Sequence, residues 1–259
     1  SETEASEQPI TGKVVGAVVG AIKILRCLAE TPEPQGVSRI AKTTELNTST
    51  TFNILRTLLM HDFVQFDRHS KTYSLSLGIM EIARAATAMS GDIGAIRPQM
   101  EAVANQHGVT LTLWQPIAAD RKLLISTTQP RNAMRIQMAI GQRLPLLVGS
   151  TGRLFAAFGT LSPDEIRQQF DRIRWQKPLS FDEFSAQVEA AREHGWALDD
   201  GNFAAGTVLI SVPVLGADGR AILAITANMF AGQFDPRQIA PIVEDLQALA
   251  RSIGRIAPL

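Results

Sequence analysis

The stretch that most constrains the fold is residues 37–62, VSRIAKTTELNTSTTFNILRTLLMHD. Apolar residues at helical spacing flank a short polar break, which predicts a helix, a tight turn and a second helix. Residues 63–76, FVQFDRHSKTYSLS, carry two short β-type runs on either side of RHSK and predict a β-hairpin. A helix-turn-helix followed by a hairpin is typical of a winged DNA-binding unit.

The charge of the chain agrees with this placement. Overall, 25 Lys and Arg balance 25 Asp and Glu, which gives a net charge of zero. Residues 12–90 hold 9 basic and 6 acidic residues. Residues 1–11 hold 3 acidic residues and no basic ones, and residues 91–259 hold 16 of each sign. The small positive excess therefore lies in the predicted DNA-binding unit, as nucleic-acid binding requires.

Composition excludes several classes of protein. The single cysteine, Cys27, excludes an intramolecular disulfide framework and a cysteine-based structural zinc site. Its apolar surroundings, AIKILRCLAE, are typical of a buried helix position. No apolar run is long enough to span a bilayer, and the acidic segment SETEASEQ does not resemble a secretory signal. We therefore expect a cytoplasmic protein with no membrane partner.

The pattern along the chain predicts four parts. Residues 1–12 form a disordered tail, residues 13–76 the winged helix-turn-helix and residues 77–91 a linker helix, with a boundary near 89–92. Within the second part, Ser38 is expected to cap the first helix of the motif, and Asn47 and Thr48 to cap the second.

Residues 92–259 alternate helices and strands. A helix at 93–107 precedes three strand candidates, VTLTLWQP, RKLLISTTQ and MRIQMAI. Helices are then expected from about Ser150, from the capping signature Ser162–Glu165, and over 181–194. Three more strands, WALDD, TVLISVPVLG and RAILAITANMF, lead to a closing helix at 235–256. This order predicts an α+β, sensor-like domain.

In their order and spacing these segments resemble the IclR family of bacterial transcriptional regulators over residues 14–255. The resemblance rests on AIKILRCLAE, VSRIAKTTELNTSTTFNILRTL, KTYSLSLGIMEIA, GQRLPLLVGSTGRLFAAF and GTVLISVPVLGADGRAILAITAN. It implies an N-terminal winged helix-turn-helix, a linker helix and a C-terminal GAF-like α/β effector-binding domain at 92–259. It also implies dimers or dimers of dimers that bind palindromic operators in double-stranded DNA and respond to a small organic metabolite, with no cofactor.

Three residues depart from the commoner family pattern. Phe52-Asn53 stands where a His-Arg pair is frequent, Gly20 where arginine is frequent, and Glu45 where the turn has glycine. With Phe52-Asn53 in place of the basic pair, DNA recognition is expected to rely on hydroxyl groups, Asn53, Arg56 and the wing.

The predicted DNA contacts lie on the second helix of the motif and on the wing. Asn pairs with adenine and Arg with guanine in the major groove, which suits Asn53 and Arg56. Hydroxyls at the helix start suit phosphate contacts. Phe52 is expected in the core, with contact to a thymine methyl group as the alternative. The alternative is an ordinary polar surface with a charged hairpin tip. The full predicted set is Ser38, Thr48, Ser49, Thr50, Asn53, Arg56, Arg68 and Lys71.

The predicted effector site follows from the resemblance, carried over position by position. Its residues lie in GSTGR, after WAL, in TVLISVP and in ITAN: Ser150, Thr151, Gly152, Asp199, Leu209, Thr226 and Asn228. A helix N-terminus near Ser150 suits a carboxylate or carbonyl, and Leu209 suits a partly apolar or aromatic ligand. Trp114, Met134 and Met138 are candidates for the lining, with plain core packing as the alternative.

The competing interpretation is a small-molecule-binding enzyme with an appended helical domain. The four histidines, His61, His69, His107 and His194, lack metal-ligand spacing. GSTG lacks the G-x-S-x-G frame of a nucleophile elbow, and the chain has no phosphate-binding glycine loop. We therefore predict a ligand-responsive regulator, with repression favoured over activation, and neither catalytic residues nor a metal site.

Overall fold

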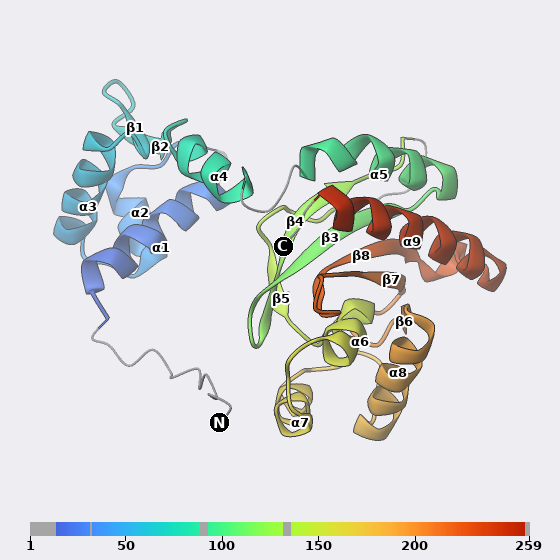
Figure 1. Ribbon diagram of the computed structural model, residues 1–259. Coiled ribbons are helices and arrows are strands. Elements are labelled where there is room, and N and C mark those ends of the chain that lie inside the picture. The colour runs from blue at the N-terminus through green and yellow to red at the C-terminus, as the bar shows by residue number, and fades with distance from the viewer. Residues whose placement is uncertain (1–13, 32, 89–92, 132–135, 257–259) are drawn as a thin grey trace, which may run out of the picture. The chain divides into compact units, whose positions relative to one another are not determined.

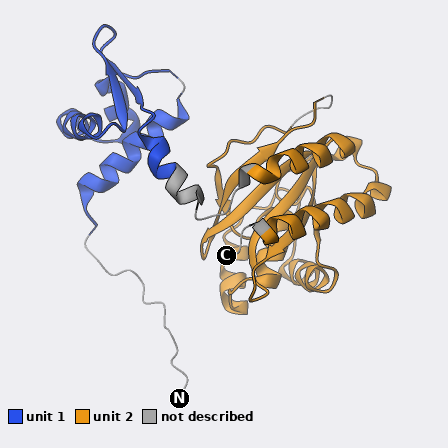
Figure 2. Cartoon of the chain, turned by 45° about the horizontal axis from the view of Figure 1, so that its top comes forward, with its two compact units in different colours: residues 1–86 blue, residues 87–259 orange. Residues whose placement is uncertain are grey.

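The chain divides into two compact units. The computed structural model describes residues 14–31, 33–88, 93–131 and 136–256. Unit 1 comprises residues 1–86 and unit 2 residues 87–259 (Figure 2). The predicted tail at 1–12 and the predicted boundary near 89–92 lie outside the described residues. Within the described ranges, no helix is long and apolar enough to cross a membrane.

Unit 1 is a helix-turn-helix with a two-stranded antiparallel wing (Figure 1). Its elements are α1 (Gly16–Glu30), α2 (Val37–Thr44), α3 (Thr48–Met60), β1 (Val64–Asp67), β2 (Thr72–Leu75) and the start of α4 (Ile79–Ala88). Buried apolar side chains from α1, α2, α3 and the wing form one core, which includes Ile24, Leu28, Ile40, Leu55, Val64 and Tyr73. The predicted winged helix-turn-helix is therefore confirmed.

The two helices of the motif begin differently, since α3 has a side-chain cap and α2 has none. Asn47 caps α3 as predicted, because its side chain accepts a hydrogen bond from the Thr50 N–H at 2.7 Å. Thr48 is then the first residue of the helix. The prediction for Ser38 is wrong: α2 begins at Val37, with Gly36 at the cap position and no side-chain cap bond. A backbone bridge between Gln35 and Tyr73 of the wing fixes the entry of the chain into α2 instead.

Phe52 is exposed, with 48% of its surface accessible, so its expected place in the core is wrong. The face of α3 that enters the core consists of Thr51, Ile54, Leu55 and Leu58, which recur every three or four residues. Position 52 lies off this stripe and leaves an aromatic ring on the surface of the helix.

The turn between α2 and α3 places a side chain in a strained conformation. Glu45 has φ 58° and ψ 32°, in the left-handed region, and its N–H donates to the Ala41 carbonyl. A residue with a Cβ costs about 1–2 kcal/mol there. Glycine avoids this cost but loses about 0.5–1 kcal/mol of chain entropy on folding.

Glu45→Gly is therefore expected to stabilise unit 1 by about 0.5–1 kcal/mol, the difference between these two costs. The three tryptophans lie at 114, 175 and 196, all in unit 2, so hydrogen exchange of the α2 and α3 amides is the suitable measurement. Glu45→Ala is the matched control, since it removes the carboxylate and keeps the Cβ. Equal stabilisation by both variants would show that charge, and not backbone conformation, is responsible.

Unit 2 is built on a six-stranded antiparallel sheet in the order β5-β4-β3-β8-β7-β6. Helices α5 and α9 cover one face, and α6 covers the other with α7 and α8 packed around it (Figure 1). The elements are α5 (Ile93–His107), β3 (Thr110–Ala118), β4 (Arg121–Thr128), β5 (Arg143–Pro145), α6 (Gly149–Phe158), α7 (Pro163–Asp171), α8 (Phe181–His194), β6 (Ala197–Asp200), β7 (Thr207–Leu215), β8 (Ala221–Phe230) and α9 (Ile239–Ile256).

The register of the central strands separates apolar from polar side chains. Leu111, Leu113 and Ile225 belong to the core beneath α5 and α9. Because side chains alternate across a strand, the neighbouring positions face α6. Thr112 pairs with Thr226 across β3 and β8, and Thr226 pairs with Ser211 across β8 and β7. A stripe of hydroxyl side chains therefore crosses the face of the sheet that α6 covers.

One strand prediction is wrong. MRIQMAI begins in residues outside the described ranges, and its described part, residues 136–140, is not a strand. The chain turns at Gly141, which has a φ of 90°. The Gly141 N–H donates to the Leu124 carbonyl, and the Leu124 N–H donates to the Gln142 carbonyl. The edge strand, β5, starts only after this turn, at Arg143.

Candidate DNA-binding face and ligand cavity

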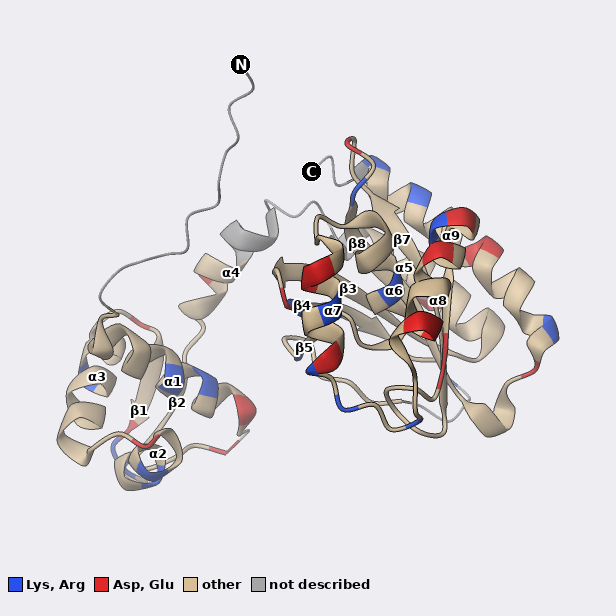
Figure 3. Cartoon of the chain, turned by 90° about the horizontal axis from the view of Figure 1, so that it is seen from below, with Lys and Arg blue, Asp and Glu red and all other residues tan. Residues whose placement is uncertain are grey.

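The exposed side of α3 carries most of the predicted DNA contacts. Thr48, Ser49, Asn53 and Arg56 are exposed and Thr50 is half-buried. Arg56 is the only charged residue of α3, and Figure 3 shows the helix as otherwise uncharged. Such a helix offers hydroxyl, amide and guanidinium groups to a groove, but little general attraction to phosphate.

The wing carries the other two basic residues of the predicted DNA contacts. Arg68 and Lys71 are exposed at the hairpin tip. Asp67 holds this tip in place, since its Oδ1 accepts hydrogen bonds from the His69 N–H at 2.8 Å and the Ser70 N–H at 3.4 Å. These bonds lower the pKa of the Asp67 carboxyl. The remaining predicted contact, Ser38, is exposed on α2.

A cavity of about 220 Å³ lies between the sheet and the start of α6. Seven of the ten predicted effector residues line it: Trp114, Met138, Ser150, Thr151, Leu209, Thr226 and Asn228. Met134 lies outside the described residues. Gly152 and Asp199 do not line it. The structure thus brings together residues from β3, α6, β7 and β8 that lie up to 114 positions apart.

Hydroxyl groups form a buried chain at the base of α6. Ser150 Oγ lies 2.6 Å from Ser211 Oγ, which lies 2.7 Å from Thr226 Oγ1. Three hydroxyls hold three protons, and these two hydrogen bonds use only two. Within the described part of the chain the third proton has no acceptor. Since Ser150 and Thr226 both line the cavity, the chain can donate one hydrogen bond to a ligand.

Asn228 adds an acceptor. Its Nδ2 donates to Thr110 O and to Thr112 Oγ1, both at 2.9 Å. The Trp114 indole N–H also donates to Thr112 Oγ1, at 3.1 Å, which fixes the ring at the cavity wall. The Asn228 Oδ1 accepts no hydrogen bond from any described residue, so it is available to a ligand donor.

Lys122 is a basic residue of the cavity lining that the sequence analysis did not predict. It lies on β4, is 2% exposed, and its Nζ donates to Val148 O and Thr151 Oγ1. The ammonium position is 5.4 Å from the centroid of the Trp114 ring. Burial, reinforced by the positive charge of Arg153 and partly opposed by Asp199, lowers the pKa of Lys122 to about 7. Its only sequence signal is a lysine at an inward position of an alternating strand.

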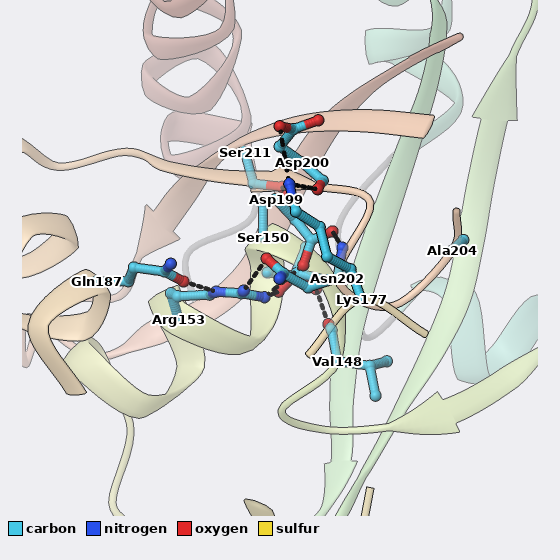
Figure 4. A network of polar contacts seen from close by, with 12 residues as sticks. Val148, Ser150, Arg153, Lys177, Gln187, Asp199, Asp200, Asn202, Ala204 and Ser211 are labelled. Atoms are coloured by element: carbon cyan, nitrogen blue, oxygen red, sulfur yellow. Dashed lines mark hydrogen bonds and ion pairs between the residues drawn. The ribbon is translucent and has the colours of Figure 1, made fainter. Parts of the chain in front are cut away.

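Arg153 is a second residue that the sequence analysis did not predict, and its ion pair with Asp199 explains why Asp199 is buried outside the cavity lining. Its guanidinium is fully buried and donates to Asp199 Oδ2 and Gly149 O at 2.7 Å each, to Gln187 at 3.0 Å and to Asn202 at 3.2 Å (Figure 4). Burial lowers the Arg153 pKa, against which Asp199 acts by its charge and its hydrogen bond. Asp199 therefore neutralises a buried cation behind the cavity wall.

Gly152 serves the packing of α6. A Cβ at this position would lie 1.9 Å from the Leu147 carbonyl oxygen, a distance that no side chain tolerates. The glycine lets the loop before the helix approach its first turn, and this sets the position of Ser150 and Thr151 in the cavity wall.

The first turn of α6 is open to a ligand. Its N-cap residue, Val148, makes no side-chain cap bond, so the first N–H groups of the helix retain their capacity to bind an anion or a carbonyl. A recognition helix in unit 1 and a small polar-lined cavity in unit 2 together define a class of protein, the DNA-binding regulator that senses a small molecule.

Comparisons with known proteins assign the chain within this class. The family model described as "IclR helix-turn-helix domain" matches residues 17–68, and the one described as "Bacterial transcriptional regulator IclR C-terminal" matches residues 87–255. The DNA-binding transcriptional repressor YiaJ of Escherichia coli is 23% identical over 249 residues, which cover 90% of this chain and 86% of YiaJ.

Solved structures share the fold. An IclR transcriptional regulator from Alicyclobacillus acidocaldarius superposes with a TM-score of 0.79 at 25% identity, over 94% of this chain and 99% of its own. An IclR homolog from Microbacterium hydrocarbonoxydans, complexed with 4-hydroxybenzoate, gives a TM-score of 0.74 at 18% identity, over 92% and 98%.

The chain belongs to the IclR family of bacterial transcriptional regulators. The predicted function class, a transcriptional regulator and not an enzyme, is therefore confirmed.

Proposed function

We propose that this protein is a cytoplasmic repressor whose affinity for a palindromic operator is set by a small organic ligand in the unit 2 cavity. The observation that carries the proposal is the cavity itself, in which a buried amine, a spare hydroxyl proton and an open helix N-terminus converge. Repression is favoured because the relatives include a named DNA-binding transcriptional repressor.

The chemistry of the lining supports one kind of ligand. Lys122 and the N–H groups at the start of α6 suit a carboxylate or a carbonyl. Trp114, Met138 and Leu209 contact the apolar part of a molecule that fits about 220 Å³. The ligand class is therefore a small organic acid or carbonyl compound with an apolar or aromatic portion. The 4-hydroxybenzoate bound by the Microbacterium homolog is an example of such chemistry.

Exposed apolar side chains support assembly into a dimer. Leu77, Met80 and Ile82, at and before the start of α4, are 85%, 53% and 58% exposed. Apolar residues grouped in this way mark interaction surfaces. Pairing two copies through this segment would present two α3 helices to successive half-sites of one operator. Ligand binding then changes operator affinity by the difference in its affinity for the two arrangements of the dimer.

Nuclease protection of a palindromic site upstream of neighbouring genes tests the DNA-binding part of the proposal. A thermal-shift screen of small carboxylates and carbonyl compounds, with 4-hydroxybenzoate among them, tests the sensing part. Absence of any protected site would contradict the repressor assignment. A ligand that stabilises the protein without altering protection would leave the cavity as a binding site with no control over DNA.

Thr226→Val and Asn228→Leu are each expected to weaken the ligand-induced change in operator affinity about tenfold, the effect of losing one buried hydrogen bond of about 1–1.5 kcal/mol. Thr127→Val is the matched control, because the Thr127 hydroxyl is buried, unpaired in the described structure and absent from the cavity lining. Ligand titrations monitored by gel shift give the measurement. A normal response from both cavity variants would place the ligand elsewhere.

Arg56→Ala is expected to weaken operator binding by about 1–3 kcal/mol and to relax preference at one base pair, since a base-reading arginine confers that much discrimination. Lys71→Ala should instead weaken operator and random DNA alike and reduce the salt slope by about one unit. Fluorescence anisotropy at several salt concentrations separates the two. If Arg56→Ala behaves like Lys71→Ala, Arg56 contacts phosphate and not a base.

A further inference from the structure

The amine of Lys122 has an environment unlike that of the other lysines described. Lys23, Lys42, Lys71 and Lys177 are exposed, whereas Lys122 is 2% exposed and lines the cavity. Its Nζ contacts two neutral acceptors, Val148 O and Thr151 Oγ1. Among the described residues no carboxylate lies within ion-pair distance of it, because the nearby Asp199 is bound to Arg153 at 2.7 Å.

We propose that Lys122 is a covalent capture site, at which the amine binds a small aldehyde or 2-oxo acid reversibly as a Schiff base. Lys122 lines the same cavity as Ser150 and Thr226, so a carbonyl compound bound there lies beside both the amine and the hydroxyl chain. The inference rests on the proposed function only in taking this cavity as the effector site.

The condensation needs no group that the cavity lacks. The Nζ lone pair attacks the carbonyl carbon, and a proton passes from nitrogen to the former carbonyl oxygen. The Thr151 hydroxyl, which is hydrogen-bonded to Nζ, is placed to carry that proton. The carbinolamine then loses its hydroxyl group and a proton as one water molecule, which leaves a C=N bond. One amine and one carbonyl thus give one imine and one water, without oxidant or reductant.

The product also fits the site. The neutral imine nitrogen carries no hydrogen, but on taking up one proton from solvent it gains an N–H, which can donate to the Val148 carbonyl oxygen in place of the amine. Its positive charge lies near the face of Trp114, at the distance where a ring stabilises a cation. A carboxylate on the captured molecule can accept from the Ser150–Ser211–Thr226 chain or from the first N–H groups of α6.

Only the neutral amine is a nucleophile, and this favours Lys122 strongly at neutral pH. An exposed lysine with a pKa of about 10.4 is neutral in roughly one molecule in 2,500 at pH 7. With its pKa lowered to about 7, Lys122 is neutral in about half of the molecules. The neutral, nucleophilic fraction of Lys122 is therefore about a thousandfold larger than that of an exposed lysine. Restricted access to the buried amine offsets part of this advantage.

The test is reductive trapping of the full chain at pH 7 with glyoxylate as the probe and cyanoborohydride as the reductant. Peptide mapping by mass spectrometry gives the modified fraction at each lysine. We expect modification at Lys122 at least tenfold above that at any exposed lysine. Preferential or equal modification of exposed lysines, or no modification of Lys122, would overturn the proposal.

Two variants complete the test. In Lys122→Met the preferred adduct should be absent, whereas in Lys177→Met, which removes an exposed lysine, trapping at Lys122 should be unchanged. Operator binding by the trapped protein separates this inference from the proposed function. A Lys122 adduct without any change in operator affinity refutes control by the cavity but keeps the capture site. A ligand that alters operator affinity while Lys122 stays unmodified refutes covalent capture alone.

Discussion

Arg153→Met is expected to destabilise unit 2 by about 3–5 kcal/mol, the usual cost of removing one partner from a buried ion pair. Both side chains of the pair with Asp199 are fully buried, so the remaining carboxylate would have neither water nor a counter-ion. The substitution also removes the donors to Gln187 and Asn202, which belong to α8 and to the loop after β6. Phe203 and Ala204 of that loop line the cavity, so ligand binding should weaken as well.

Urea unfolding followed by tryptophan fluorescence measures this loss, because all three tryptophans are in unit 2. Arg167→Met is the matched control: Arg167 pairs with Asp171 at 3.0 Å, but both side chains are more than half exposed. Exposed pairs contribute less than about 1 kcal/mol. The double variant Arg153→Met, Asp199→Leu should recover much of the stability, because it leaves no unpaired charge. A cost for Arg153→Met as small as the control's would contradict this account.

Local interactions explain which structural features could be predicted from the sequence. The capping box of Ser162 with Glu165 is present as predicted, and Gly195 ends α8 in the left-handed conformation. Each of these signals acts over three or four residues, so the chain carries them without reference to the rest of the fold. The prediction for Ser38 failed because a bridge between Gln35 and Tyr73, 38 residues apart, decides where α2 begins.

Distant pairings explain why Lys122 and Arg153 were missed. The hydrogen bond from Lys122 to Thr151 spans 29 residues, and that from Arg153 to Asp199 spans 46. In sequence each is a basic residue next to apolar residues, and the side-chain partner that buries with it lies far along the chain. Only the sheet order and the packing of α6 bring the partners together, and burial then lowers the pKa of each basic group.

The direction in which each side chain points from its helix or strand explains why only some of the residues predicted from the resemblance line the cavity. Thr226 and Asn228 are two residues apart on β8, so both side chains lie on the same face of the sheet. Leu209 of β7 pairs with Asn228, which places its side chain beside them. Gly152, only one residue beyond Thr151, is turned by about 100° around α6 and packs on Leu147 instead. The elements of the site could therefore be inferred by analogy, whereas the side chains that reach the cavity depended on helix phase and strand register.

Lys122→Met is expected to stabilise unit 2 in acid and to lose this advantage as the pH rises. The pKa of Lys122 falls from 10.5 to about 7 on folding. Between these values the unfolded chain binds more protons than the folded protein, so the stability of the wild type increases with pH. The slope approaches about 1.4 kcal/mol per pH unit, and below pH 7 the buried charge costs up to about 5 kcal/mol. Methionine carries no charge and removes this dependence.

Urea unfolding of the wild type and Lys122→Met at pH 6, 7, 8 and 9 measures the difference directly. The advantage of the variant should be a few kcal/mol at pH 6, because the lost hydrogen bonds to Val148 and Thr151 offset part of the gain. It should shrink at each step above pH 7. Lys177→Met is the control, since Lys177 is exposed and its ion pair with Asp200 contributes little at any of these pH values. A difference that stays constant from pH 6 to 9 would mean that Lys122 remains charged in the folded protein, in which case neither the amine chemistry nor the pH dependence of this cavity holds.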